Sequence, residues 1–118
     1  MKIPAILEDD IGLVNFTLVR GVDKAIRVDF STDPAALDIS LWSFAVNFYS
    51  GRPLVASPVL SSVAGTIEIF AVEKYIILNF TAAALAAFVS GPYQWDLRFT
   101  APALSGQILK GSVALGEI

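Results

Sequence analysis

Short segments in which apolar and polar side chains alternate recur along the chain, separated by turn residues. Alternation at every second position places one set of side chains on each face of an extended strand, so this pattern predicts half-buried β-strands. The clearest example is 93–99, where four apolar residues alternate with Gln94, Asp96 and Arg98. Similar segments lie at about 13–20, 24–30, 42–50, 66–72, 75–80 and 107–115, with a weaker, proline-containing edge segment at 54–60.

The turn residues predict how some strands connect. Gly21, Val22 and Asp23 separate the first two segments, so we expect 13–20 and 24–30 to form an antiparallel hairpin. Their inward-facing side chains would be Val14, Phe16, Leu18, Ile26, Val28 and Phe30.

One segment has helical character. Thr81 is a good N-cap, 82–88 consists mostly of strong helix formers, and Gly91-Pro92 ends the helix. The whole pattern predicts an all-β (mainly β) fold: an antiparallel β-sandwich of about seven or eight strands with one short helix near residues 81–88. We expect a single domain over 1–118, in which 1–12 form an N-terminal arm.

Composition narrows the class of protein. Hydrophobic residues make up 55% and charged residues 16%, against roughly 45–50% and 25% in ordinary soluble domains. A dense core or a surface that meets other subunits would account for the excess. No apolar run is long enough for a membrane span, and 8–10 are acidic where a signal peptide would be hydrophobic. The net charge is −3 and the basic residues are scattered, which argues against nucleic-acid binding.

The sequence offers little catalytic chemistry. It contains no histidine and no cysteine, so Ser–His and Cys–His catalysis and the common zinc sites are excluded, and we expect no cofactor. Asp29 and Asp96 could still act as an acid and a base in a small enzyme. Each has an arginine two positions away on the same strand face, Arg27 and Arg98 respectively, so structural ion pairing is the simpler explanation.

Two further patterns bear on binding. Carboxylates at 8–10, and at Asp33 with Asp38, lack the alternating ligand spacing of a calcium loop, so we expect 8–10 to be a solvated arm. In the segment 42–50, one face carries four large apolar residues. The opposite face is only weakly polar and is our first candidate for a contact surface; it consists of Ala45, Asn47 and Tyr49.

Six short motifs occur in order over nearly the whole chain: 16–21 (FTLVRG), 37–40 (LDIS), 65–67 (GTI), 78–82 (LNFTA), 93–98 (YQWDLR) and 106–113 (GQILKGSV). In this order they resemble a structural β-sandwich domain of tailed bacteriophages, the N-terminal domain of upper baseplate and tail-fibre-associated proteins. Leu41 and the apolar ending at 47–49 depart from the pattern.

The resemblance implies a non-enzymatic structural or docking module of a phage or prophage particle, in the tail, baseplate, neck or fibre attachment. Such a module is made in the bacterial cytoplasm and resides in the virion. Its partners would be other phage structural proteins or further copies of itself, with no nucleic acid and no membrane. Arg20 and Asp96 are the matched polar positions, with a structural role in which the two could pair.

An alternative is a carbohydrate-binding β-sandwich used in host-surface recognition. That function needs an exposed aromatic platform, so Tyr49, Tyr75 or Tyr93 would have to be open to solvent. Tyr93 and Trp95 alternate with polar residues on a strongly patterned strand, which favours a role in the core for both.

Overall fold

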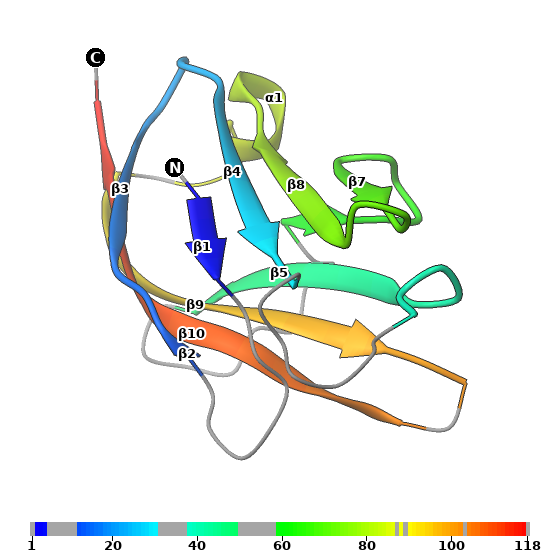
Figure 1. The fold of residues 1–118 in the computed structure, drawn as a ribbon. Helices are drawn as coiled ribbons and strands as arrows, with labels where there is room; N and C mark the ends of the chain where they lie inside the picture. The colour runs from blue at the N-terminus through cyan, green and yellow to red at the C-terminus, as the bar shows by residue number, and fades with distance from the viewer. Residues whose placement is uncertain are drawn as a thin grey trace.

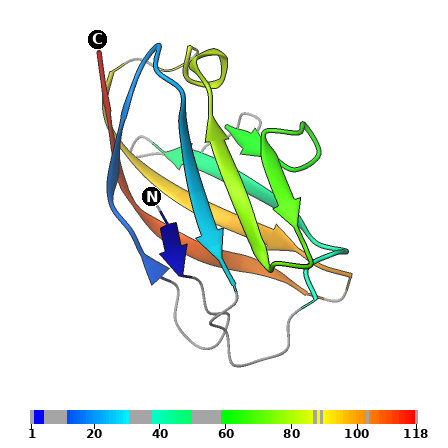
Figure 2. The same ribbon diagram turned by 45° about the horizontal axis from the view of Figure 1, so that its top comes forward.

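The computed structural model describes residues 2–4, 12–30, 38–49, 59–86, 88, 90–102 and 104–117. These residues form two facing β-sheets and one short helix (Figure 1 and Figure 2). The all-β prediction is therefore confirmed. The smaller sheet has four strands, in the order β1 (Lys2–Pro4), β4 (Lys24–Asp29), β8 (Tyr75–Phe80) and β7 (Ile67–Phe70).

The larger sheet has six strands, and β9 (Gly91–Thr100) lies near its middle. On one side of β9 lies β10 (Ser105–Gly116), whose far edge pairs with two short strands, β2 (Gly12–Leu13) and β3 (Phe16–Val19). On its other side lie β5 (Ser43–Tyr49) and then β6 (Leu60–Ser61). The predicted edge segment 54–60 lies mostly outside the described residues, and its last residue begins β6.

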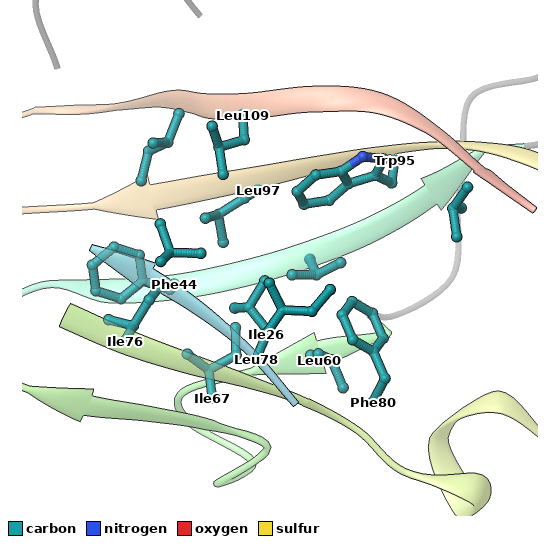
Figure 3. Close-up of a cluster of buried hydrophobic side chains, with 14 of the residues drawn as sticks. Ile26, Phe44, Leu60, Ile67, Ile76, Leu78, Phe80, Trp95, Leu97 and Leu109 are labelled. Atoms are coloured by element: carbon teal, nitrogen blue, oxygen red, sulfur yellow. The ribbon is translucent and has the colours of Figure 1, made fainter. Parts of the chain in front are cut away.

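The core lies between the sheets, where alternate side chains of each strand meet. In Figure 3, Trp95, Leu97 and Leu109 of the six-stranded sheet point towards Ile26 and Leu78 of the four-stranded sheet. Each such side chain contributes about 1.5–3 kcal/mol when it leaves water. Of the inward positions predicted in the first two segments, Val14 is only partly buried; the others are confirmed as buried: Phe16, Leu18, Ile26, Val28 and Phe30.

The predicted hairpin between 13–20 and 24–30 is wrong. β3 pairs in parallel with β10, Phe16 opposite Val113, whereas β4 pairs antiparallel with β8 and parallel with β1. The chain therefore crosses from one sheet to the other at the turn around Gly21, which has a φ of 83°. Alternation shows which face of a strand is buried but does not identify its neighbour, and both strands bury one face in the same interior. With three parallel pairs, the sandwich is mixed rather than purely antiparallel.

The helix is shorter than predicted, and its start is confirmed. α1 spans Ala82–Leu85, and the hydroxyl of Thr81 accepts a hydrogen bond from the backbone N–H of Ala84 at 3.1 Å. The carboxylate of Asp23 accepts from the N–H of Ala82 at 2.8 Å, so a second side chain caps the same end. The predicted arm at 1–12 contains β1 and the first residue of β2, and each of these short strands pairs with a longer strand.

Val14 and Asn15 lie between β2 and β3 and interrupt the pairing of this edge with β10. The interruption requires a glycine on the neighbouring strand. A Cβ atom on Gly111 of β10 would overlap the carbonyl oxygen of Val14. That oxygen instead accepts a hydrogen bond from the indole N–H of Trp95 at 2.8 Å. Beside it, the side-chain oxygen of Asn15 accepts from the backbone N–H of Ser112 at 2.9 Å and from its hydroxyl at 3.0 Å. These bonds hold the interrupted edge against β10.

We expect Gly111→Ala to lower the free energy of unfolding by about 2 kcal/mol or more, because the added methyl group must displace the backbone at Val14. Gly116→Ala is the matched control on the same strand, where the added Cβ would lie 3.8 Å from the carbonyl oxygen of Leu18. It should change stability by no more than about 0.5 kcal/mol. Urea denaturation of both variants measures the difference, and equal stabilities would contradict the close approach.

Candidate functional site

The outward face of the six-stranded sheet is hollowed beside Asp96. This hollow, which we call the outer groove, has a volume of about 660 Å³ and is bordered by β2, β10, β9 and the end of β5. Its volume lies within the range of about 300–1,000 Å³ that ligand and anchor pockets commonly occupy. The lining side chains that matter for the argument are Leu13, Tyr49, Gln94, Asp96, Arg98, Gln107 and Lys110.

Asp96 is the centre of this site. Its side chain points away from the core, yet the residue is only 2% exposed because neighbouring side chains surround it. Asn47 donates to one carboxylate oxygen at 3.1 Å. The other oxygen accepts from the hydroxyl of Tyr49 at 2.9 Å, from Nε of Arg98 at 3.0 Å and from the amide of Gln107 at 3.0 Å. Three adjacent strands thus place four donors around one carboxylate, which compensates the cost of burying its charge.

A β-bulge in β10 brings Gln107 into this network. The register shifts between Gln107 and Leu109, so Ile108 is the extra residue. Lys110 faces outward opposite Asp96, and strict alternation would therefore turn Gln107 towards the core. With the bulge, both Ile108 and Leu109 are buried and Gln107 reaches Asp96.

The electrostatics of the network are set by Asp96. Burial raises the pKa of the Tyr49 phenol, and the hydrogen bond to Asp96 and its negative charge raise it further. The hydrogen bond to Asp96 also raises the pKa of Arg98. A carboxylate has about four acceptor positions, and four protein donors already contact Asp96. The network thus holds Tyr49 and Arg98 in fixed positions on the outer face.

The two aspartates proposed as an acid and base do not come together. Asp29 lies on the outward face of β4 and Asp96 on the outward face of β9, so they face away from each other on opposite sheets. Sheets pack about 10 Å apart, which leaves the core between the two groups. Each aspartate has its expected arginine within the same strand: Arg27 Nη2 lies 3.5 Å from Asp29, and Arg98 Nε lies 3.0 Å from Asp96.

Arg20 and Asp96, which the sequence suggested could pair, have different partners in the structure. Arg20 forms an ion pair with Glu117 at 2.6 Å and donates to the carbonyl oxygen of Ala86 at 3.5 Å. It lies in the turn after β3, next to the end of β10 to which β3 is paired. Arg20 therefore connects that turn to the end of β10 and to the helix C-terminus.

The three residues predicted as a contact surface all face outward on β5 and are half-buried. Tyr49 lines the outer groove, and Asn47 bonds to Asp96 beside it. Ala45 lines a second, smaller hollow of about 300 Å³, and Arg98 borders both hollows. Their shared placement agrees with the sequence pattern, while their role in contacts stays a prediction. Sequence reasoning did not single out Gln94, Gln107 and Lys110 as members of this face.

The carboxylates considered for calcium do not gather in the part of the chain that the structure describes. No group of three or more Asp, Glu, His or Cys residues there is arranged to hold a metal ion. The carboxylate of Asp38 accepts a hydrogen bond from the backbone N–H of Ser40 at 3.0 Å, while Asp33 and 8–10 lie outside the described residues. Among the described helical residues, none form a span of the length and apolarity that crossing a bilayer requires.

We expect Asp96→Ala to lower the free energy of unfolding by about 2–4 kcal/mol, because four partly buried donors lose their acceptor. Glu68→Ala is the control, since Glu68 is an exposed carboxylate with one hydrogen bond, from Asn79. Its effect should be about 0.5 kcal/mol or less. Thermal and urea unfolding followed by circular dichroism measure both, and a small effect at Asp96 would contradict its organising role.

The raised pKa of Tyr49 predicts a pH dependence. The phenol should lose its proton above its ordinary value of 10.0. Because the folded pKa exceeds the unfolded one, the stability that this group contributes is complete below about pH 10 and is lost as pH rises through the folded pKa. The tyrosinate absorbance of the wild type minus that of Tyr49→Phe isolates this step. Asp96→Asn should move it to lower pH, and a step at or below 10 in the wild type would refute the assignment.

No protein-family model matches the sequence, and no curated protein matches it. Comparison with solved structures does find similar folds, among them the N-terminal domain of phage TP901-1 ORF48. The two structures align with a TM-score of 0.53 over 98% of this chain and 98% of that domain, at 9% sequence identity. At this identity the similarity is one of fold. The resemblance to a structural β-sandwich domain of tailed bacteriophages is thus confirmed at the level of the fold.

Proposed function

We propose that this chain is a structural docking module of a bacteriophage particle and acts through protein–protein contacts. The observation that carries the proposal is the fold similarity to a phage domain over 98% of both chains. A match of that extent involves the whole two-sheet unit rather than a common hairpin. We place the protein in the virion, after synthesis in the host cytoplasm.

The contact surface in this proposal is the outer face of the six-stranded sheet. Tyrosine and arginine are enriched at the energetic centres of protein interfaces, and Asp96 fixes both Tyr49 and Arg98 here. Side chains already held in place lose less conformational entropy when a partner binds. Apolar residues stand at the border of this face: Leu13 is 70% exposed beside the outer groove, and Val63 is 90% exposed beside the smaller hollow.

The carbohydrate-binding alternative is less well supported. The ring of Tyr75 stacks on the ring of Phe70, with 4.6 Å between the two centroids. The guanidinium carbon of Arg27 lies over the same tyrosine ring, 3.7 Å from its centroid. The other two tyrosines are also engaged. Tyr93 packs against Phe48 and Phe88 beside the core, in agreement with the role predicted for it, and the hydroxyl of Tyr49 bonds to Asp96.

The proposal is tested by mixing the purified chain with each purified tail, neck, fibre and baseplate protein of its own phage and measuring complexes by native mass spectrometry. We expect a complex with at least one of them, or a defined homo-oligomer. Ala45→Arg should weaken it about tenfold or more, because a large charged side chain enters the middle of the contact face.

Ala25→Arg is the matched control, since Ala25 is exposed on β4 of the other sheet. It should leave binding unchanged, and circular dichroism should show both variants folded. A chain that stays monomeric at high concentration and binds none of these proteins would overturn the proposal. Equal effects of the two substitutions would overturn the choice of face.

A further inference from the structure

We propose that the outer groove is an anchor pocket for an acidic side chain, Asp or Glu, presented by a partner protein. The inference rests on the proposed docking function and names the chemistry of the partner. It follows from three observations: the charges at the groove, the geometry of the donors, and the apolar residue at its border.

The charges at the groove are opposite in sign to those of the chain as a whole. The sequence has a net charge of −3, yet the exposed ionisable groups that line the groove are the cations Lys110 and Arg98. The one carboxylate in the lining is Asp96, which is 2% exposed and already bonded to Arg98. Within the described residues, the Lys110 ammonium group has no ion-pair or hydrogen-bond partner. A partner carboxylate would supply one.

The donors are placed to receive a carboxylate. Lys110 lies directly opposite Asp96 in the pairing of β10 with β9, and Gln94 is the next outward residue along β9. The Nε atom of Arg98 donates to Asp96 and its guanidinium also interacts with Tyr49, but the side chain is 54% exposed and has five N–H donors, so some of these remain for a second acceptor. The lining of the groove thus offers an entering carboxylate an ammonium, a guanidinium and an amide as donors.

The border of the groove suits a protein side chain. Leu13 pairs with Lys110 from the other side of β10 and is 70% exposed. The methylene groups of a glutamate could pack on this leucine while its carboxylate reaches Lys110. A sugar ring, in contrast, would require an exposed aromatic face, and the tyrosine in the lining, Tyr49, is half-buried. The observations therefore favour an acidic protein segment.

The test uses nuclear magnetic resonance titration of the ¹⁵N-labelled full chain at constant ionic strength. The probes are N-acetylglutamate N-methylamide, which carries one carboxylate, and its neutral isostere N-acetylglutamine N-methylamide. We expect the glutamate probe to shift the amide signals of Gln94, Arg98 and Lys110, with an affinity about two- to fivefold higher than that of the glutamine probe. Equal affinities, or shifts confined to other regions, would overturn the inference.

Matched variants assign the effect to one cation. Lys110→Gln should weaken binding of the glutamate probe about two- to fivefold, and Lys110→Arg should restore it. Lys24→Gln makes the same change of charge on the other sheet, where the Lys24 ammonium group already donates to the carbonyl oxygen of Thr17. Lys24→Gln should leave the affinity for the glutamate probe unchanged. Equal losses of affinity in Lys110→Gln and Lys24→Gln would show that the probe does not bind at the outer groove.

Two competing occupants are outcomes of the same experiment. A methyl glucuronide probe that binds tenfold more tightly than the glutamate probe would overturn the inference in favour of a glycan. In the other outcome, signals at the groove shift with protein concentration alone and do not respond to the glutamate probe. That result would overturn the inference and identify a second copy of the chain as the occupant. A positive titration without any complex with phage proteins would leave the anion site intact and reject the docking function, so the two failures are distinguishable.

Discussion

The burial of Trp95 is the constraint on which both faces of the six-stranded sheet depend. Its indole N–H needs an acceptor inside the protein, since an unsatisfied buried donor costs about 1–3 kcal/mol. Val14 supplies that acceptor because Gly111 leaves room for its carbonyl group. The next residue, Asp96, points to the opposite face and gathers its own donors there. Two adjacent residues of β9 thus position the edge strand on one side and the outer groove on the other.

The longer strands were predictable from the sequence, but their partners were not, and the short strands β1 and β2 were not predicted. Regular alternation in β5 and β9 identified Phe44 and Leu97 as core residues, because one face of each strand is buried. Thr81 was recognisable as a cap because its hydroxyl satisfies a free backbone N–H at a helix start. The neighbours of β3 and β4 were predicted wrongly, since a short glycine turn fits a hairpin as well as a crossing between sheets.

The outer face was partly predictable for a similar reason. Tyr49 follows the alternation of β5, and the spacing of Asp96 and Arg98 places them on one side of β9. Gln107 could not be placed without recognising the bulge. The adjacent apolar residues Ile108 and Leu109 are the one signal of it, because two neighbours cannot both face the core in a regular strand. Nothing in the pattern distinguishes Lys110 from other exposed lysines; its position opposite Asp96 comes from the register.

The parallel pairing of β3 with β10 has a consequence for how the protein is made. Phe16 lies opposite Val113, so β3 finds its neighbour only after the whole intervening segment up to β10 has left the ribosome. Contacts between such distant segments slow folding, to about milliseconds to seconds in comparable β-rich domains. Until then the edge of β3 stays unpaired and open to aggregation. A product truncated before β10 would lack the strand that covers this edge.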